Sequence, residues 1–501
     1  MHASDLPMII QGGMGAAVSD WRLARAVAAC GQLGVVSGTG IDTILIRRLQ
    51  DGDPDGAMRR AMAHFPIPGV AERVLTAYFR PDGRAPGEPY DLLPMYNLKV
   101  SKERQQIAIL AAFVEVWLAK EGHDRPIGMN LLTKIQLPNL ALLYGALLAG
   151  VDVIIMGAGI PREIPAALDA LAAHLPARLT AEIEGDEGAP PTYITFDPRE
   201  HWAGEPPPLR RPLFLPIVAS VTLATMFARK IAGVDGLVIE GPTAGGHNAP
   251  PRGELQLNER GEPLYGPRDL VDPTKVAALG LPFWLAGGTA SPEGLAAARA
   301  AGAMGIQVGT LFAFCNDSGL AEPLRRSVLD AAARGAVDVF TDPRASPTGY
   351  PFKVVRWDND PAQGVPRQRI CDLGYLRTMY RTPKGTIGYR CASEPIATFV
   401  KKGGNLCDTE GRRCLCNALM SNIGVGQARA DIGVEPPLLT SGDDLRRLPT
   451  IFDVTQGYSA ADVIAYLLGQ RPPVAAISLA TKPAATVADQ VSASRSAHHR
   501  H

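Results

Sequence analysis

The feature that most constrains the fold is an eightfold alternation of short apolar runs with helical stretches. Near-continuous apolar strands separated by helices indicate a parallel sheet that is covered on both faces. Eight such units favour an α/β fold closed into a TIM (β/α)₈ barrel. The expected strands are residues 8–11, 33–37, 127–131, 151–156, 215–220, 236–240, 283–286 and 305–308.

A doubly wound open sheet is the main competing arrangement, because it also alternates strands with helices. Each expected strand has Gly, Asn or Ser at or next to its C-terminal end. A barrel gathers all eight of these ends around one mouth, where polar and glycine-rich turns can build a site. We therefore predict the barrel, with the functional site at the C-terminal ends of its strands.

The barrel is expected to occupy residues 1–335, with two departures from the repeat. Residues 51–125 are too long for one crossover and contain a helical piece, so they predict an inserted segment near the mouth. Residues 336–470 are richer in Arg, Pro, Gly and Cys, which indicates an appended region. Residues 471–501 are biased towards Ala, Ser, Thr and Pro, which predicts a disordered tail.

Composition excludes some classes of partner and location. Formal net charge is zero and the sequence pI is about 7.1, which argues against binding to nucleic acid or to an acidic membrane surface. The first seven residues lack a basic secretory region. The most apolar window, 137–161, is interrupted by Asp152 and four glycines, so it does not resemble a membrane span. A cytoplasmic protein with reduced cysteines is expected.

The strongest candidate for catalysis is His247, in the stretch from Glu240 to Asn248 that follows the sixth strand. Gly245 and Gly246 would let the backbone approach a ligand and would hold the histidine at the mouth. Histidine titrates near neutral pH, so it suits general acid or base work. A hydrogen-bonded structural histidine at the start of a loop is the alternative, and the barrel position favours the functional role.

Glycine-rich turns predict a phosphate site beside His247. Gly287 and Gly288 follow the seventh strand, and the segment Gln307, Val308, Gly309 and Thr310 ends the eighth. Barrels often bind phosphate through backbone N–H groups at these two positions. Gly12, Gly13 and Met14 after the first strand, and Asn130 in the third, would border a large planar ligand. As the alternative, Asn130 would cap its own turn.

Taken in order, these motifs resemble the nitronate monooxygenase family, once called 2-nitropropane dioxygenases, which includes FMN-dependent enoyl-acyl-carrier-protein reductases. The resemblance covers roughly residues 5–320 and rests on the segments 7–14, 128–130, 157–159, 240–247, 286–288 and 307–310. It implies an FMN-binding barrel with His247 as the base or orienting residue. It implies that Gly245, Gly287, Gly288 and 307–310 lie near the FMN phosphate, with Gly12, Gly13, Met14, Asn130 and Glu240 also bordering the flavin.

The resemblance leaves two activities open. The first is oxidation of a small activated carbon acid, such as a nitronate, by O₂. The second is reduction or dehydrogenation of an acyl thioester, with an acyl carrier protein as a partner. Nitronate oxidisers commonly have Gln where this chain has Glu240, whereas the enoyl reductases often have Glu there. The partners are a small-molecule substrate and O₂ in the first case, and an acyl thioester or acyl carrier protein in the second. A homodimer is one candidate assembly, and a flavin-binding scaffold is the non-enzyme alternative.

Five of the seven cysteines fall within residues 371–416. Cys414 and Cys416 are close enough in sequence to reach one metal, and four thiolates suit zinc or an iron–sulfur cluster. The sequence therefore offers Cys371, Cys391, Cys414 and Cys416 as metal ligands. The alternative is a set of reduced, partly buried thiols, because the spacing is not a standard C-x₂-C pair.

Overall fold

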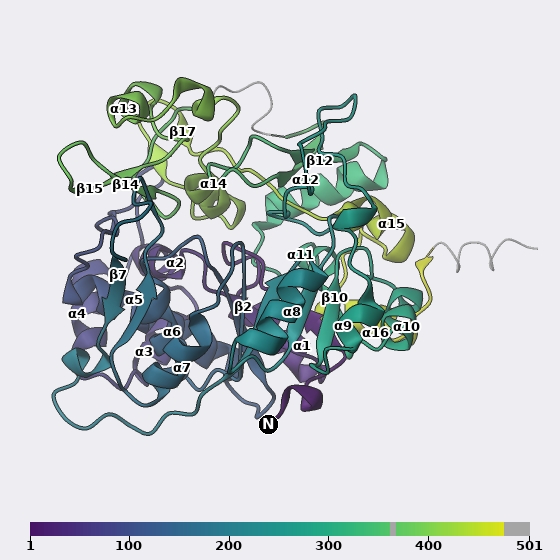
Figure 1. Ribbon diagram of the computed structural model, residues 1–501, viewed down its shortest axis with the longest axis horizontal. Coiled ribbons are helices and arrows are strands. Elements are labelled where there is room, and N and C mark those ends of the chain that lie inside the picture. The colour runs from purple at the N-terminus through teal and green to yellow at the C-terminus, as the bar shows by residue number, and fades with distance from the viewer. Residues whose placement is uncertain (361–366, 475–501) are drawn as a thin grey trace, which may run out of the picture.

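A parallel eight-stranded barrel forms the centre of the molecule (Figure 1). The computed structural model describes residues 1–360 and 367–474. Strands follow the order β1-β11-β10-β9-β8-β4-β3-β2. Leu33 N donates to Ile9 O at 3.1 Å, and Gln11 N donates to Leu33 O at 3.0 Å. These bonds join β1 to β2, so the sheet closes on itself.

All eight barrel strands predicted from the sequence are present, with ends that shift by two residues at most. The closed sheet confirms the barrel and excludes the doubly wound alternative. The strands are β1 Ile9–Gln11, β2 Gly34–Ser37, β3 Ile127–Leu132, β4 Val153–Gly157, β8 Leu213–Val218, β9 Leu237–Glu240, β10 Phe283–Ala286 and β11 Gly305–Val308.

Two helices of the surrounding ring come from unexpected parts of the chain. Helix α5, Lys102–Lys120, packs between α1 and α6, so it follows β2 as a ring helix although it lies within residues 51–125. Helix α16, Ala460–Leu467, packs against α1, α10 and α11. The other ring helices are α1 Trp21–Ala29, α6 Asn139–Leu148, α7 Ile164–Ala172, α8 Val221–Lys230, α9 Pro273–Ala277 and α10 Pro292–Ala300.

Shorter elements surround the barrel, and the segments coloured green in Figure 1 lie over one end of it. Helices here are α2 Ile41–Gln50, α3 Ala57–Met62, α4 Val70–Tyr78, α11 Thr310–Ala313, α12 Glu322–Ala333, α13 Ile396–Lys401, α14 Leu415–Asn422 and α15 Leu448–Ile451. The 3₁₀ helices are η1 Ala3–Asp5, η2 Pro198–His201, η3 Pro267–Asp269, η4 Leu406–Thr409 and η5 Asp443–Arg447. The division into an insertion at 51–125 and an appended region at 336–470 stays a prediction.

Small sheets lie outside the barrel, and one of them joins segments that are far apart in the sequence. Strand β6, Ile183–Glu184, pairs with β14, Thr378–Arg381, which also pairs with β15, Ile387–Arg390. The other pairs are β5 Ala177–Thr180 with β7 Tyr193–Phe196, β12 Val337–Asp342 with β13 Phe352–Trp357, and β16 Ala428–Arg429 with β17 Gly433–Val434. The predicted disordered tail, 471–501, lies outside the described residues from 475 onward.

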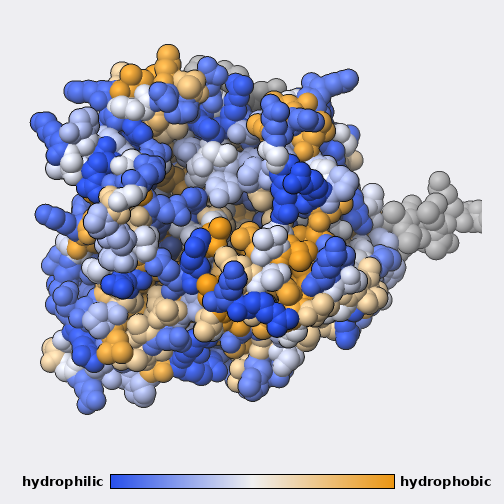
Figure 2. Space-filling view, viewed as in Figure 1, coloured by the Kyte–Doolittle hydropathy of each residue, from blue (hydrophilic) through white to orange (hydrophobic). Residues whose placement is uncertain are grey.

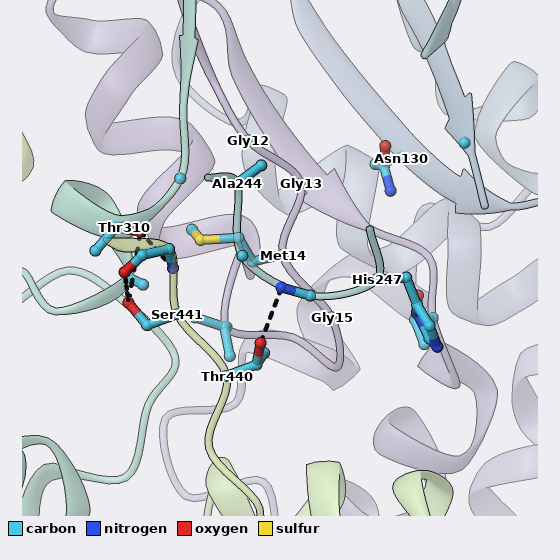
Figure 3. A pocket seen from close by; sticks show the side chains of 18 of the residues that line it. Gly12, Gly13, Met14, Gly15, Asn130, Ala244, His247, Thr310, Thr440 and Ser441 are labelled. Atoms are coloured by element: carbon cyan, nitrogen blue, oxygen red, sulfur yellow. Dashed lines mark hydrogen bonds between the residues drawn. The ribbon is translucent and has the colours of Figure 1, made fainter. Parts of the chain in front are cut away.

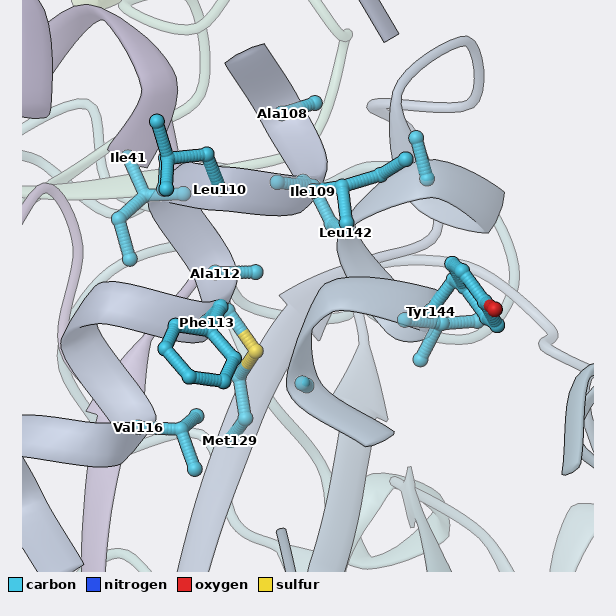
Figure 4. Close-up of a cluster of buried hydrophobic side chains, with 14 of the residues drawn as sticks. Ile41, Ala108, Ile109, Leu110, Ala112, Phe113, Val116, Met129, Leu142 and Tyr144 are labelled. Atoms are coloured by element: carbon cyan, nitrogen blue, oxygen red, sulfur yellow. The ribbon is translucent and has the colours of Figure 1, made fainter. Parts of the chain in front are cut away.

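The largest apolar core lies where α5 packs against α6 and the barrel strands (Figure 4). Ser101 caps α5 by accepting a hydrogen bond from Arg104 N at 3.2 Å, which fixes where the helix begins. Phe113 of α5 and Leu142 of α6 are both buried in this core. Burying such side chains stabilises the fold by about 1.5–3 kcal/mol each.

Replacing Gly145 of α6 by Ala is expected to lower the melting temperature. An added Cβ there would lie 2.1 Å from the Ile109 carbonyl oxygen of α5, so the two helices would have to move apart. Such overpacking costs about 1–3 kcal/mol. Thermal unfolding checks the effect, with Gly204→Ala as the control, because a Cβ at Gly204 meets no atom within 4 Å. Equal melting temperatures for the two variants would contradict this helix contact.

The surface shown in Figure 2 carries hydrophilic side chains over most of its area, with apolar side chains in separate small patches. Within residues 1–360 and 367–474, no helix has both the length and the apolar character needed to cross a bilayer. The buried apolar residues form clusters around the barrel strands.

Candidate functional site

One cavity at the C-terminal ends of the strands brings the predicted site residues together (Figure 3). His247 is part of its wall. Their role in cofactor binding stays a prediction, but their meeting in one place is a property of the fold. The predicted cofactor-binding residues that line the cavity are Gly12, Gly13, Met14, Asn130, Glu240, Gly245, Gly287, Gly288, Gln307, Val308, Gly309 and Thr310.

The turn after β1 is held rigidly by buried polar side chains. Gln11 Nε2 donates to Ser19 Oγ at 2.7 Å, and Ser19 Oγ donates to Gly12 O at the same distance. Met14 N donates to Ser19 Oγ at 2.9 Å. A Cβ at Gly13 would come within 2.3 Å of Asn130 Cβ, so only glycine lets this turn approach β3. The backbone of residues 12–14 therefore forms a fixed edge of the cavity.

Two amide side chains at the cavity lack partners. In the described part of the chain, the Asn130 side chain makes no hydrogen bond, and Figure 3 shows it beside the Gly12–Gly13 turn. Gln307 Oε1 is buried and also without a partner among the described residues. Buried polar groups are normally hydrogen-bonded, so unpaired ones at a cavity indicate a ligand with complementary donors and acceptors.

The opposite end of the cavity is built from tight backbone turns. Gly287 and Gly288 have φ angles of 84° and 74°, which residues other than glycine rarely adopt. A Cβ at Gly287 would also lie 3.0 Å from Ala244 N. Gly309 and Thr310 follow β11, next to this turn in the cavity wall. Backbone N–H groups converge in such glycine turns, which suits an anionic group.

Residues far along the chain complete this end, and the sequence analysis did not identify them. Gly442 N donates to Thr310 Oγ1 at 2.9 Å, and Ser441 Oγ lies 3.5 Å from the same oxygen. Gly246 N donates to Thr440 Oγ1 at 2.9 Å (Figure 3). The run of small residues from Thr440 to Gly442 is the only sequence feature that could have drawn attention to them.

His247 is held by a hydrogen bond and by aromatic contacts. Its Nε2 lies 2.7 Å from Ser346 Oγ, and its ring meets the edge of Phe352 with centroids 4.9 Å apart. Burial lowers the pKa of His247 to about 4, so the imidazole is neutral at pH 7. Ser346, which is fully buried, hydrogen-bonds Thr348 at 2.8 Å and was not predicted from the sequence.

Glu240 is the other titratable group that the sequence analysis placed in this cavity. Its side chain makes no hydrogen bond among the described residues. Burial raises the pKa of Glu240 to about 7, because it disfavours the charged carboxylate. At neutral pH the group is therefore close to half-protonated.

The wall facing these polar groups is apolar and comes from residues beyond 336. It contains Leu376, Leu415, Leu419 and Met420. Tyr375, in the same wall, is anchored to the barrel side by Asp42 and by Thr43, whose Oγ1 lies 2.7 Å from the tyrosine oxygen. The cavity thus has a polar face made by the strand ends and an apolar face made by the covering segments.

The predicted metal site is not supported. Among residues 1–360 and 367–474, no three His, Cys, Asp or Glu side chains are gathered so that they could hold a metal ion. Burial raises the pKa of Cys371 to about 12 and of Cys391 to about 11, and both thiols interact electrostatically with Cys414. Cys371, Cys391, Cys414 and Cys416 are free thiols in this structure.

Fold and cavity define a TIM-barrel protein with a large ligand site at the strand ends. Residues 211–341 match the family described as nitronate monooxygenase. This range contains strands β8 to β11 and the segments around Glu240, His247, Gly287 and Thr310. The match agrees with the resemblance found in the sequence, and it covers this part of the chain.

Individual relatives match over shorter stretches. A probable nitronate monooxygenase of Staphylococcus haemolyticus is 34% identical over 128 residues, which are 25% of this chain and 34% of the relative. The (3aS,4S,5R,7aS)-5-hydroxy-7a-methyl-1-oxo-octahydro-1H-indene-4-carboxyl-CoA dehydrogenase of Mycobacterium tuberculosis is 34% identical over 116 residues, 23% of this chain and 29% of the relative. The chain thus spans about a third of the length of these relatives.

A solved structure, FabK from Thermotoga maritima, covers 95% of this chain and 94% of its own. Its sequence identity to this chain is 17% and the TM-score is 0.46.

Proposed function

We propose that the chain is an FMN-dependent oxidoreductase that oxidises a small activated carbon acid, such as a nitronate, with O₂. The observation that carries the proposal is the single cavity that contains all twelve predicted cofactor residues together with His247. FMN would supply a two-electron acceptor that passes electrons to O₂. The cytoplasmic location and a homodimer, both expected from the sequence, stay predictions.

The residues present fit FMN in two respects. The unpaired Asn130 amide and Gln307 Oε1 offer hydrogen bonds to a polar heterocycle or to a ribityl chain. The turn at Gly287 and Gly288 offers backbone N–H groups to a phosphate, and the hydrogen bond from Gly442 N to Thr310 Oγ1 fixes the cavity wall beside that turn. In this assignment, the residues beyond 440 form part of the phosphate site.

His247 is proposed to orient the substrate and to accept its proton. When Nε2–H donates to Ser346 Oγ, the lone pair on Nδ1 is available to a proton on the substrate carbon. A pKa of about 4 keeps that nitrogen unprotonated at neutral pH, although it also makes it a modest base. For a nitronate, which is already deprotonated, the orienting role is the main one.

The rate of nitronate oxidation is expected to fall as pH rises through about 7. Glu240 ionises in that range because its pKa is raised to about 7, and its negative charge then repels an anionic substrate in the same cavity. Glu240→Gln should remove this step from the pH profile of kcat/KM. If the step persists in Glu240→Gln, the titrating group is a different one.

An acyl-thioester reductase or dehydrogenase, with a carrier protein or CoA as the thiol, is the second candidate. The apolar wall of Leu376, Leu415, Leu419 and Met420 favours it, because an acyl chain buries apolar surface there. The name of the M. tuberculosis relative, a carboxyl-CoA dehydrogenase, points the same way.

Anaerobic reduction of the flavin distinguishes the two activities. The purified protein is mixed with propionate 3-nitronate, with a saturated acyl thioester, or with NADPH followed by an enoyl thioester, while visible absorbance is recorded. Bleaching by the nitronate, with oxygen consumption when air returns, supports the first activity. Bleaching only by the thioester or by NADPH supports the second. A bound flavin that none of these reagents reduces would contradict both.

A further inference from the structure

We infer that a second cavity, separate from the one at the strand ends, binds a ligand that carries a phosphate or diphosphate group. This cavity has a volume of about 480 Å³ and is lined by β13 and by segments within 367–369, 411–414 and 435–438. Pockets for small molecules usually have volumes of about 300–1,000 Å³. No described residue lines both cavities, so each has a wall of its own.

Positive charge exceeds negative charge in the wall of this arginine cavity. Among the described residues of the wall, five arginines face two carboxylates, Asp360 and Glu435, which leaves an excess of three positive charges. Glu435 is also shared, because Arg429 Nε lies 3.2 Å from its Oε2 whereas Arg367 Nη1 lies 4.0 Å from its Oε1. Like charges in one hollow repel each other, so an anion among them is stabilised. The five are Arg356, Arg367, Arg369, Arg412 and Arg413.

Three of these arginines are held in place by backbone carbonyls. Arg367 Nη1 donates to Pro436 O at 2.7 Å, and Arg369 Nη1 donates to Ala392 O at 2.8 Å. Arg412 donates to three further backbone carbonyl oxygens. A carbonyl accepts the N–H but has no net charge, so it fixes a guanidinium without cancelling its positive charge. These three side chains are therefore held in position and still attract an anion.

The other two arginines lie where a ligand can reach them. Arg356 is exposed, and its Cζ lies 3.6 Å from the centroid of the Phe340 ring. The Arg413 side chain is 33% exposed, and its Nη2 is 3.7 Å from Asp342 Oδ2. A guanidinium presents parallel N–H groups that match two oxygens of one phosphate. A phosphate group also carries about two negative charges at neutral pH, against one for a carboxylate, so it matches the excess charge better.

Calorimetric titration of the full-length protein with pyrophosphate tests the site. One pyrophosphate per chain is expected to bind, and Arg356→Gln/Arg413→Gln should weaken it at least about tenfold, because charge-assisted hydrogen bonds are lost. Arg326→Gln is the matched control and should bind as the wild type does. Arg326 lies on α12, has a side chain that is 63% exposed, and is not part of the cavity wall.

The titration is run with and without saturating FMN, because the glycine turns of the other cavity also suit a phosphate. Pyrophosphate in the arginine cavity should stay bound when FMN is present. Complete displacement by FMN, or equal affinity in the wild type and the double variant, would overturn the inference. Either result would leave the flavin assignment untouched.

Further titrations identify the source of the phosphate group. NADPH and coenzyme A each carry a diphosphate on a larger body, and they are compared with pyrophosphate in the wild type and the double variant. The tightest ligand whose affinity falls in the double variant is the best match to the site. If none of the three binds, or none loses affinity in the double variant, the inference is wrong.

A measurement on the unmodified chain covers the case in which the double variant does not fold. Phenylglyoxal modifies arginine side chains, and peptide mapping shows which ones have reacted. Pyrophosphate at ten times its dissociation constant should slow the modification of Arg356 and Arg413 about tenfold, since it leaves about a tenth of the sites free. Modification of Arg326 should not change. Equal modification of Arg356 and Arg413 with and without pyrophosphate would contradict a site between them.

Discussion

Asp42→Asn is expected to lower the free energy of unfolding by about 3–5 kcal/mol, because it leaves the Arg104 guanidinium buried without a counter-charge. Asp42 is 1% exposed and Arg104 is 5% exposed, and their side chains are 2.6 Å apart. Tyr96 and Tyr375 also donate hydroxyl hydrogen bonds to the Asp42 carboxylate. Tyr375 lines the cavity at the strand ends, so a weaker bond to residue 42 should also loosen the apolar wall of that cavity.

Urea unfolding followed by circular dichroism measures this loss. Asp55→Asn is the matched control, since Asp55 pairs with Arg22 at the surface, with half of its side chain exposed, and such pairs contribute at most about 1 kcal/mol. Hydrogen bonds and Arg104 lower the pKa of Asp42, so its stabilisation is complete at neutral pH and is lost as pH falls through that lowered value. Equal shifts for the two variants would contradict the buried network.

His247→Ala is expected to reduce turnover by about 10²–10⁴-fold while flavin content stays unchanged. The substitution removes the Nδ1 atom proposed to face the substrate and leaves the backbone of the glycine turns in place. Steady-state assays with the substrate identified by flavin reduction measure the effect. His123→Ala, at the end of α5 and outside the cavity lining, is the control and should retain wild-type turnover.

Ser346→Ala tests whether the orientation of the His247 ring matters for turnover, because this variant keeps the ring and removes its hydrogen-bond partner. Removing the hydroxyl deletes the 2.7 Å contact with His247 Nε2 and frees the imidazole to turn. A loss of kcat smaller than that of His247→Ala, with little change in KM, is the expected result. If His247→Ala itself turned over like the wild type, the proposed role of the cavity would be contradicted.

The barrel was predictable because each of its strands is buried on both faces. Such strands read as continuous apolar runs, for example Val153–Gly157, and glycine follows several of them. Residues at the strand ends, such as Asn130 and Glu240, could therefore be placed around one mouth from the sequence alone. Their meeting in one cavity follows from the closure of the sheet.

The rest of the site depends on contacts that no local pattern encodes. Ser441 and Gly442 meet Thr310 across more than a hundred residues of chain, within a segment that has no strand or helix periodicity. Helix α16 similarly joins the ring long after the eighth strand. Short elements joined by irregular turns carry little period, so their positions are set by tertiary packing.

The cysteines also show that a local sequence pattern does not report tertiary contacts. The short spacing of Cys414 and Cys416 indicated a shared ligand, but spacing in sequence does not report the burial of Cys371 and Cys391. Burial decides whether a thiol is available as a thiolate, and it is a property of the fold. No three possible metal ligands gather among the described residues, so metal binding by these cysteines stays a prediction without structural support.

Titration of the flavin-free protein with FMN and with riboflavin, followed by flavin fluorescence, tests most directly whether this cavity is an FMN site. Saturation at one FMN per chain is predicted, with riboflavin bound at least about tenfold more weakly, because a phosphate held by charge-assisted hydrogen bonds contributes about 1.5 kcal/mol or more. Equal affinity for the two flavins would contradict a phosphate site at Gly287 and Gly288. No binding of either would contradict the flavin assignment itself.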